Sequence, residues 1–305
     1  MRRVLGASSC VARKSLRPEA RLPVVLAAGL ARRVRSAARL LAAACLVLGS
    51  TGPAALAGEL PLEARVPRMD RPLAQLAHAR RLKQAMYART EDDRPFWRGL
   101  AVEAYLAVGS YHPQAAEVVA EAAFRAGELL RAGGRGEEAV EAFSIAVSRG
   151  KGTAFRARAK LEIGHVWRRK GDDRRALDQF LSVASDSAAR QAHRDDAWLW
   201  AGRIWHRAGR FEDAHRAWRG VAEGAGDPLD RIQAYDEWIL SLHARSESSE
   251  ASFTLQACSD ALADRALEET QHGERVRSAL ARMRARVVLE EKRDSSGSAR
   301  RSRKP

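Results

Sequence analysis

One short signature recurs three times between residues 127 and 218. Each copy begins with a glycine, and a second glycine, an alanine and an aromatic residue follow at offsets of 7, 12 and 16 residues. The copies are Gly127/Gly134/Ala139/Phe143, Gly164/Gly171/Ala176/Phe180 and Gly202/Gly209/Ala214/Trp218. They are spaced first by 37 and then by 38 residues. A fixed period of this size is typical of stacked repeats, because a single repeat cannot bury its apolar face alone.

Each copy indicates two helices joined by a glycine-containing turn. In the first copy, residues 121–131 carry apolar side chains at helical spacing, and the glycines around Gly134 end that segment. A glycine just beyond a helix end suits the left-handed backbone that is needed there. The second helix begins near Glu137 and carries Ala139 and Phe143 one turn apart on the same face. We expect the small residues to let helices approach closely, and the aromatic residue to fill the space between pairs.

The signature resembles the tetratricopeptide repeat (TPR) family, whose pattern is W-x2-L-G-x2-Y, then A-x3-F, then P. The third copy follows that pattern best, with Trp198, Gly202, Trp205, Ala214 and Trp218. The resemblance implies an all-α fold, a TPR-like α-solenoid of stacked antiparallel helix pairs. The period here is longer than the 34 residues of the family. Because the spacing from glycine to alanine is the usual one, we expect the extra residues between one pair and the next.

The alanine of the signature also recurs outside the three strong copies, at Ala101 and, more weakly, at Ala251. The repeat array is therefore predicted over 95–262, with about four to five helix pairs. The other predicted segments are a lead-in with an N-terminal helix over 58–94, a long charge-rich capping helix over 263–291, and a disordered basic tail over 292–305. Terminal repeats are often atypical because one of their faces meets water.

Residues 1–57 read as an N-terminal extension with a signal peptide. Basic residues precede an apolar run over 40–57, which ends in Ala55-Leu56-Ala57, a small-x-small cleavage pattern. We expect an exported protein with cleavage after Ala57. The longer linkers between pairs resemble those of exported repeat proteins of the bacterial envelope, which implies a periplasmic or envelope-associated protein. The alternatives are an uncleaved anchor, which would be the chain's only membrane contact, and lipidation at Cys45.

The positive charge does not indicate a nucleic-acid partner. The formal net charge of the chain is +15. Residues 1–57 contribute +9 and residues 292–305 contribute +5, so that the predicted folded part, 58–291, carries only +1. A nearly neutral, arginine-rich helical array is typical of solvated helix faces with ion pairs three or four residues apart. We therefore expect no nucleic-acid binding.

The sequence contains no recognisable catalytic or cofactor motif. The HExxH, GxxxxGK[ST], GxSxG and CxxC patterns are all missing. Of the three cysteines, Cys258 alone lies outside the predicted signal segment, and its apolar neighbours are typical of a small buried residue. We expect no enzyme activity, no cofactor and no metal site.

The resemblance to TPR proteins implies a concave groove lined by the first helix of each pair. The candidate groove residues by motif position are Arg125, Glu128, His165, Arg168, Arg169, Trp200, Arg203, His206 and Arg207, together with the apolar Phe124, Leu161 and Leu199. Trp205, Trp218 and Trp198 fall on core positions of the motif, whereas Trp200 does not. An exposed tryptophan ringed by arginines would suit a peptide-binding groove. Alternatively, Trp200 packs on a neighbouring loop and the arginines are solvated.

These observations favour a non-catalytic scaffold or adaptor that binds a protein or peptide in the cell envelope through its concave groove. The Lys/Asn clamp that the family uses for acidic chain ends is not reproduced, because Phe124 and Leu161 stand at its lysine positions. Two alternatives stay open at this point. One is a glycan- or peptidoglycan-associated envelope protein, and the other is a structural array that self-associates.

Overall fold

The computed structural model describes residues 65–301, and every regular element in that range is a helix. The chain divides into two units, Met1–Leu60 and Pro61–Pro305, of which only the second contains described residues. The predicted signal segment therefore lies outside the described residues. Within residues 65–301, no helix combines the length and the apolar character that a bilayer crossing requires.

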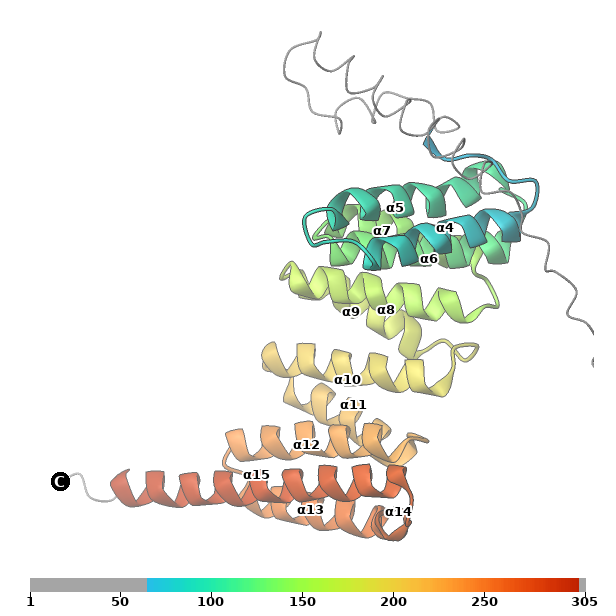
Figure 1. The fold of residues 1–305 in the computed structure, drawn as a ribbon. Coiled ribbons are helices and arrows are strands. Elements are labelled where there is room, and N and C mark those ends of the chain that lie inside the picture. The colour runs from blue at the N-terminus through green and yellow to red at the C-terminus, as the bar shows by residue number, and fades with distance from the viewer. Residues whose placement is uncertain (1–64, 302–305) are drawn as a thin grey trace, which may run out of the picture. The chain divides into compact units, whose positions relative to one another are not determined.

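Five consecutive helix pairs form most of this unit, in chain order (Figure 1). The pairs are α4 (Pro72–Tyr87) with α5 (Arg94–Tyr111), α6 (Ala116–Ala132) with α7 (Gly136–Arg149), α8 (Ala154–Arg169) with α9 (Asp173–Ala184), α10 (Gln191–Arg207) with α11 (Phe211–Gly224), and α12 (Pro228–Ala244) with α13 (Ser248–Ala261). Each helix packs on its neighbours in the chain, and the first helices of successive pairs also contact one another. This is a TPR-like α-solenoid.

The three copies of the signature lie in equivalent surroundings. Ala139, Ala176 and Ala214 are all fully buried, as are the aromatic residues four positions later. A Cβ atom added at Gly127 would lie 2.6 Å from the ring of Phe143. At Gly164 the corresponding distance to the ring of Phe180 is 2.8 Å, and at Gly202 the added atom would overlap Trp218. The glycine and the aromatic residue of each copy are in close contact. This contact lies within each helix pair, which corrects the expectation that the aromatic residue fills the space between pairs.

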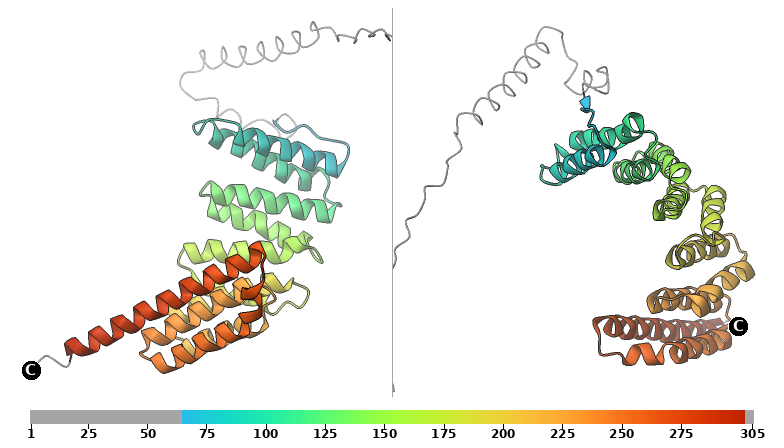
Figure 2. Two further views of the ribbon diagram at one scale, coloured as in Figure 1. Left: turned by 60° about the horizontal axis from the view of Figure 1, so that its bottom comes forward. Right: turned by 90° about the vertical axis from the view of Figure 1, so that its right-hand side faces the viewer.

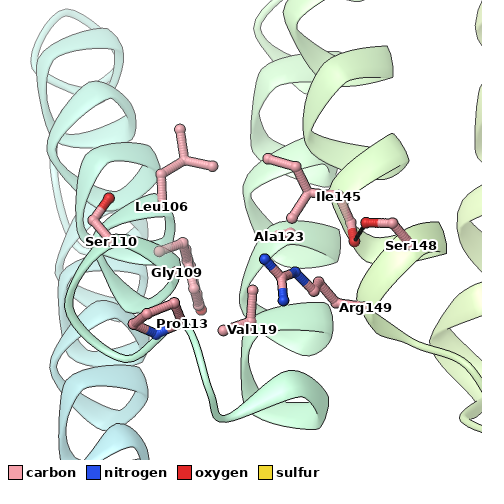
Figure 3. Close-up of a pocket in the computed structure, with 10 residues that line it drawn as sticks. Leu106, Gly109, Ser110, Pro113, Val119, Ala123, Ile145, Ser148 and Arg149 are labelled. Carbon is pink, nitrogen blue, oxygen red and sulfur yellow. Dashed lines mark hydrogen bonds between the residues drawn. The ribbon is translucent and has the colours of Figure 1, made fainter.

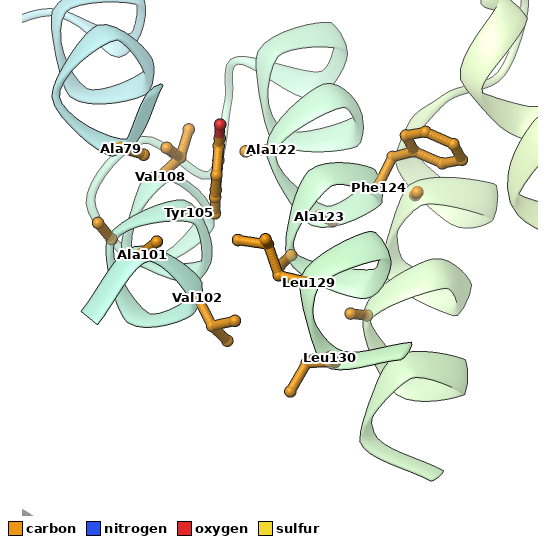
Figure 4. Packing of buried hydrophobic residues seen from close by; sticks show 14 of the residues in the cluster. Ala79, Ala101, Val102, Tyr105, Val108, Ala122, Ala123, Phe124, Leu129 and Leu130 are labelled. Atoms are coloured by element: carbon orange, nitrogen blue, oxygen red, sulfur yellow. The ribbon is translucent and has the colours of Figure 1, made fainter. Parts of the chain in front are cut away.

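The first and last pairs replace this contact by related ones. In the first pair Tyr105 is buried between α5 and α6, close to Ala101 and Ala122 (Figure 4). In the last pair Ile239 stands at the position of the glycine, and the half-buried Leu255 stands at that of the aromatic residue. In the last pair the first helix thus has a larger side chain and the second helix a smaller one than in the three copies, which keeps the core filled.

The turn inside four of the pairs has the same hydrogen-bonding pattern. At the first of these turns the Gly134 N–H donates to the Arg131 carbonyl at 3.1 Å, and the Arg135 N–H donates to the Leu130 carbonyl at 3.0 Å. These two bonds define a Schellman ending, which requires a left-handed residue at the position of Gly134. Gly171 and Gly209 occupy this position with φ of 80° and 73°, and Ser246 occupies it with φ of 63°.

Replacing Ser246 with glycine is expected to raise the free energy of unfolding by about 0.5–1 kcal/mol. A left-handed conformation costs an L-residue about 1–2 kcal/mol, and glycine avoids this cost. The gain in stability is smaller than that, because unfolded glycine has more conformational freedom to lose on folding. Urea titration followed by circular dichroism measures the change. The reciprocal variant Gly171→Ser should be destabilised, and an unchanged midpoint in both variants would contradict a strained backbone at Ser246.

The C-terminal segment differs from the single helix expected over 263–291. The structure has a short helix, α14 (Ala263–Leu267), and then α15 (Gln271–Arg301). The residues between them precede Gly273, where an added Cβ would collide with the Glu268 carbonyl, so the chain turns tightly there. Helix α15 packs on α12 and α13, and Figures 1 and 2 show it beside them. Val276, Leu280, Met283 and Val287 form its buried stripe.

Helix α15 also continues past residue 291, through most of the segment 292–305 that was predicted to be disordered. Extending an existing helix fixes one residue for each hydrogen bond gained, which is far easier than starting a new helix. The packed part of α15 therefore supplies the nucleus that an isolated basic tail lacks.

Candidate functional site

The predicted groove residues lie on the first helices, and the structure brings them together in two groups. In the first group, Glu128 of α6 attracts cations from three helices. The Arg125 Nη1 atom lies 2.9 Å from a Glu128 carboxylate oxygen, while Lys83 of α4 and Arg158 of α8 approach the same carboxylate at 3.9 and 3.8 Å. This group is an internally paired ionic cluster that joins three first helices.

The second group surrounds Trp200 at the contact between α8 and α10. The guanidinium carbons of Arg168 and Arg203 each lie 4.3 Å from the centre of the Trp200 ring. The His165 ring meets the indole edge-on at 5.0 Å, and the Phe180 ring stacks against it at 6.2 Å. Trp200 is half-buried. It therefore packs on the neighbouring pair and is ringed by arginines at the same time, which combines the two alternatives that the sequence left open.

Charges of both signs lie around Trp200, with the arginines in the majority. Burial raises the pKa of Asp196, whereas the charge of Arg203 and a hydrogen bond from Trp200 lower it. Burial lowers the pKa of His165 to about 4, and the next largest causes are the nearby Arg168 and Arg169. Burial also lowers the pKa of Arg168, with smaller contributions from neighbouring arginines. His165 is thus neutral at pH 7.

Two of the arginines in this group are already paired. Arg203 lies 2.6 Å from Glu237 of α12, and Arg207 lies 2.7 Å from Asp173 of α9. Within residues 65–301, no carboxylate comes within ion-pair distance of Arg168 or Arg169. Asp173 attracts Arg168 and Glu162 attracts Arg169, but neither arginine forms a direct ion pair with these carboxylates.

Four of the candidate groove residues, three apolar residues and one histidine, belong to neither of these two groups. Phe124, Leu161 and Leu199 are buried in the core, which corrects their assignment to the groove. Their shared motif position, three residues before the glycine, points inward. His206 packs within its own pair, with its ring centre 5.3 Å from Phe211 and 5.8 Å from Trp218.

Two tryptophans assigned to the core are only half-buried. Trp198 and Trp205 line a hollow between α10 and α11, whereas Trp218 is fully buried as expected. The equivalent positions hold Ala123 and Leu130 in the first copy and Lys160 and Trp167 in the second. Because the family pattern has aromatic residues at both positions, the sequence alone did not indicate that these two indoles line a cavity.

A separate cavity of about 450 Å³ lies between α5, α6 and α7 (Figure 3). Leu106 and Ile145 face each other across its opening, and both are more than one-third exposed. Arg149 of α7 is the one charged residue among those that line it. The cavity therefore offers an apolar slot with a single positive charge in its lining.

The described residues offer little for chemistry. Burial raises the pKa of Cys258 to about 12, so the thiol is protonated at neutral pH and acts as a small apolar group. Within residues 65–301, no three His, Cys, Asp or Glu side chains are grouped so that they could hold a metal ion.

No protein-family model and no curated protein matches the chain. Solved structures of helical repeats are similar to it. The nearly identical TPR-like repeats of a putative kinesin light chain from Podosopora anserina share 17% identity, with a TM-score of 0.46, over 66% of this chain and all of theirs. MamA shares 15% identity, with a TM-score of 0.41, over 68% of this chain and 96% of its own. BtubC (BKLC) from P. vanneervenii shares 14% identity, with a TM-score of 0.39, over 73% of this chain and 93% of its own. The assignment of the fold rests on the recurring contacts within this chain.

Proposed function

We propose that this TPR-like α-solenoid is a non-catalytic scaffold that binds a protein or peptide on its first helices, at the contact between α8 and α10. The observation that carries the proposal is that two guanidinium groups, those of Arg168 and Arg203, lie against the half-buried Trp200 ring. A tryptophan held in place by its neighbours offers a large contact area at a small cost in conformational entropy. Tryptophan and arginine are also the residues that contribute most often to binding energy at protein interfaces.

The charges around Trp200 favour a particular kind of partner segment. Arg168 and Arg169 lack carboxylate partners within the described chain, and a guanidinium group binds a carboxylate through two parallel hydrogen bonds. A partner segment with an apolar side chain could pack on the Trp200 ring, and an Asp or Glu side chain beside it could bind the guanidinium groups. The proposed site uses Trp200, Arg168 and Arg169, while Arg203 and Arg207 hold the adjoining helices.

Trp200→Ala and Arg169→Ala are each expected to reduce recovery of the partner at least about tenfold, as loss of a binding hot spot of about 1.4 kcal/mol or more would do. The measurement is quantitative mass spectrometry of proteins retained by the immobilised chain. Arg174→Ala is the matched control, because Arg174 is exposed on α9, away from Trp200. Retention of the same partner by both groove variants, with unchanged circular dichroism, would contradict the proposal.

The alternatives give other results in the same experiment. A glycan-associated protein would be retained by purified peptidoglycan or polysaccharide without a protein partner. A self-associating array would retain chiefly its own chain, and its elution volume in gel filtration would depend on its concentration.

We also propose export, on the basis of the basic segment, the apolar run and the Ala55-Leu56-Ala57 pattern. These residues lie outside the described part of the chain. Mass spectrometry of the protein purified from its source is expected to give a mature N-terminus at Gly58. Recovery of peptides from residues 1–57 in the mature protein would contradict cleavage at this position.

A further inference from the structure

A second candidate binding site lies on the side of α10 away from Trp200. A cavity of about 390 Å³ opens between α10 and α11, and Trp198 and Trp205 form part of its wall. These two residues are seven positions apart and so share one face of the helix, while Trp200 lies roughly 140–160° around the axis from them. The cavity is therefore separate from the proposed groove site.

The aromatic wall consists of two indole rings in contact. Their centres are 6.3 Å apart and their planes are inclined by 35°. Both residues are half-buried, so each has one part packed into the core and another part at the cavity. On the α11 side the lining includes Ala217 and Gly220, and a Cβ atom added at Gly220 would meet open space. Flat indole surfaces beside small residues leave room for a side chain that enters from outside.

One end of the cavity holds a buried carboxylate without a cationic partner. Asp195 is 3% exposed and accepts a hydrogen bond of 2.7 Å from the Gln191 amide. Within residues 65–301, no ammonium or guanidinium group lies within ion-pair distance of it. The adjacent Arg194 donates instead to the carbonyl groups of Ser187 and Ala189. By contrast, Asp213 at the other end is held by Arg210 at 2.6 Å and by Arg216 at 3.2 Å.

Charges of both signs surround Asp195. Burial raises the pKa of Asp195, whereas the hydrogen bond from Gln191 and the positive charge of Arg194 lower it. Burial also raises the pKa of Asp230 to about 6, and the negative charges of Asp227, Asp195 and Asp196 add to that effect. A positive group placed at this end of the cavity would relieve the repulsion between these carboxylates.

We propose that this cavity binds a lysine or arginine side chain of a protein partner, with the cationic group at Asp195 and the methylene groups against Trp198 and Trp205. A cation near an indole face is attracted by the ring, and the apolar stem of a long basic side chain packs on aromatic surface. The site differs in chemistry from the first-helix site, where the protein supplies the positive charge. A partner that used both surfaces would carry an acidic segment and a basic one.

The experiment is a titration of the ¹⁵N-labelled full chain with the blocked pentapeptide Gly-Gly-Arg-Gly-Gly, followed through the indole N–H signals. Trp198→Phe and Trp205→Phe assign those signals. The expected result is a saturable shift of both, with binding at least about tenfold weaker for the otherwise identical peptides that carry Leu or Glu in place of Arg, since a desolvated cation–aromatic contact contributes about 1–2 kcal/mol.

Matched variants separate the cavity from the rest of the surface. Gly220→Leu should fill the cavity and abolish the shifts, whereas Gly220→Ala should retain them, because its Cβ meets open space. Asp195→Asn should weaken binding about tenfold or more, since it removes the charge of the acceptor. Trp200→Ala should bind the peptide as the wild type does, so failure of the groove proposal leaves this one standing.

Any one of the following results would overturn the proposal. They are shifts of equal affinity with the Leu and Glu peptides, no saturable shift with the Arg peptide, and unchanged binding by Gly220→Leu. Loss of the shifts in Trp200→Ala would indicate that the peptide binds to the first-helix surface, and this result would also overturn the proposal. Circular dichroism of each variant confirms that the helices are intact.

Discussion

Replacing Phe180 with alanine is expected to lower the free energy of unfolding by about 3–5 kcal/mol, the usual cost of removing a fully buried aromatic side chain. The ring has no exposed surface and fills the space that Gly164 leaves within the α8–α9 pair. It also stacks on Trp200 of the next pair. A void there would remove contacts between α8, α9 and α10. These helices could close the void only by shifting relative to the neighbouring pairs.

Chemical denaturation with urea at pH 7 measures this effect. The matched control is Phe253→Ala in α13, where the same substitution removes a ring that is 76% exposed. The control should change the free energy of unfolding by less than about 0.5 kcal/mol, as surface substitutions usually do. A loss below about 1 kcal/mol in Phe180→Ala would contradict the role of the ring as the filler between the helices.

Gly164→Ala is expected to lower the free energy of unfolding by about 1–3 kcal/mol, the typical cost of overpacking a core. The new Cβ atom would lie 2.8 Å from the Phe180 ring, a distance that forces the ring or the helix to move. The sign is informative, because glycine to alanine in an unobstructed helix usually stabilises by about 0.5–1 kcal/mol. Gly220→Ala in α11 is the control for that gain, since its Cβ meets open space.

A double-mutant cycle tests whether the two positions exchange volume. Leucine at 180 shortens the side chain and gives the new methyl group at 164 room, so Gly164→Ala combined with Phe180→Leu should cost less than the two single changes together. The last pair already has this arrangement, with Ile239 opposite Leu255. Strictly additive costs would contradict direct contact between positions 164 and 180.

Much of the array follows from the sequence because its determinants are local and repeated. The glycine, alanine and aromatic positions indicated which residues belong to the core, and the burial of the alanines at 139, 176 and 214 confirms this. The turn glycines could be identified for the same reason, since a Schellman ending depends only on neighbouring residues. Ser246 occupies the same position without glycine, so the turn glycines of the sequence did not indicate it.

The site was harder to predict, because the direction of a side chain depends on the neighbouring helices. Motif position placed Phe124, Leu161 and Leu199 in the groove, yet all three point into the core. The His206 ring packs against Trp218 of α11. Trp200 lies on the predicted face, but its contacts with His165 and Phe180 come from the preceding pair and could not be derived from its own repeat.

The position of α15 bears on whether copies of this protein can join end to end. Its buried stripe packs mainly on α12 and less extensively on α13, whereas the first helix of an earlier pair contacts the pair before it mainly through that pair's second helix. The C-terminal helix therefore does not continue the repeat. A second copy that stacked on this end in the manner of successive pairs would have to accommodate α15.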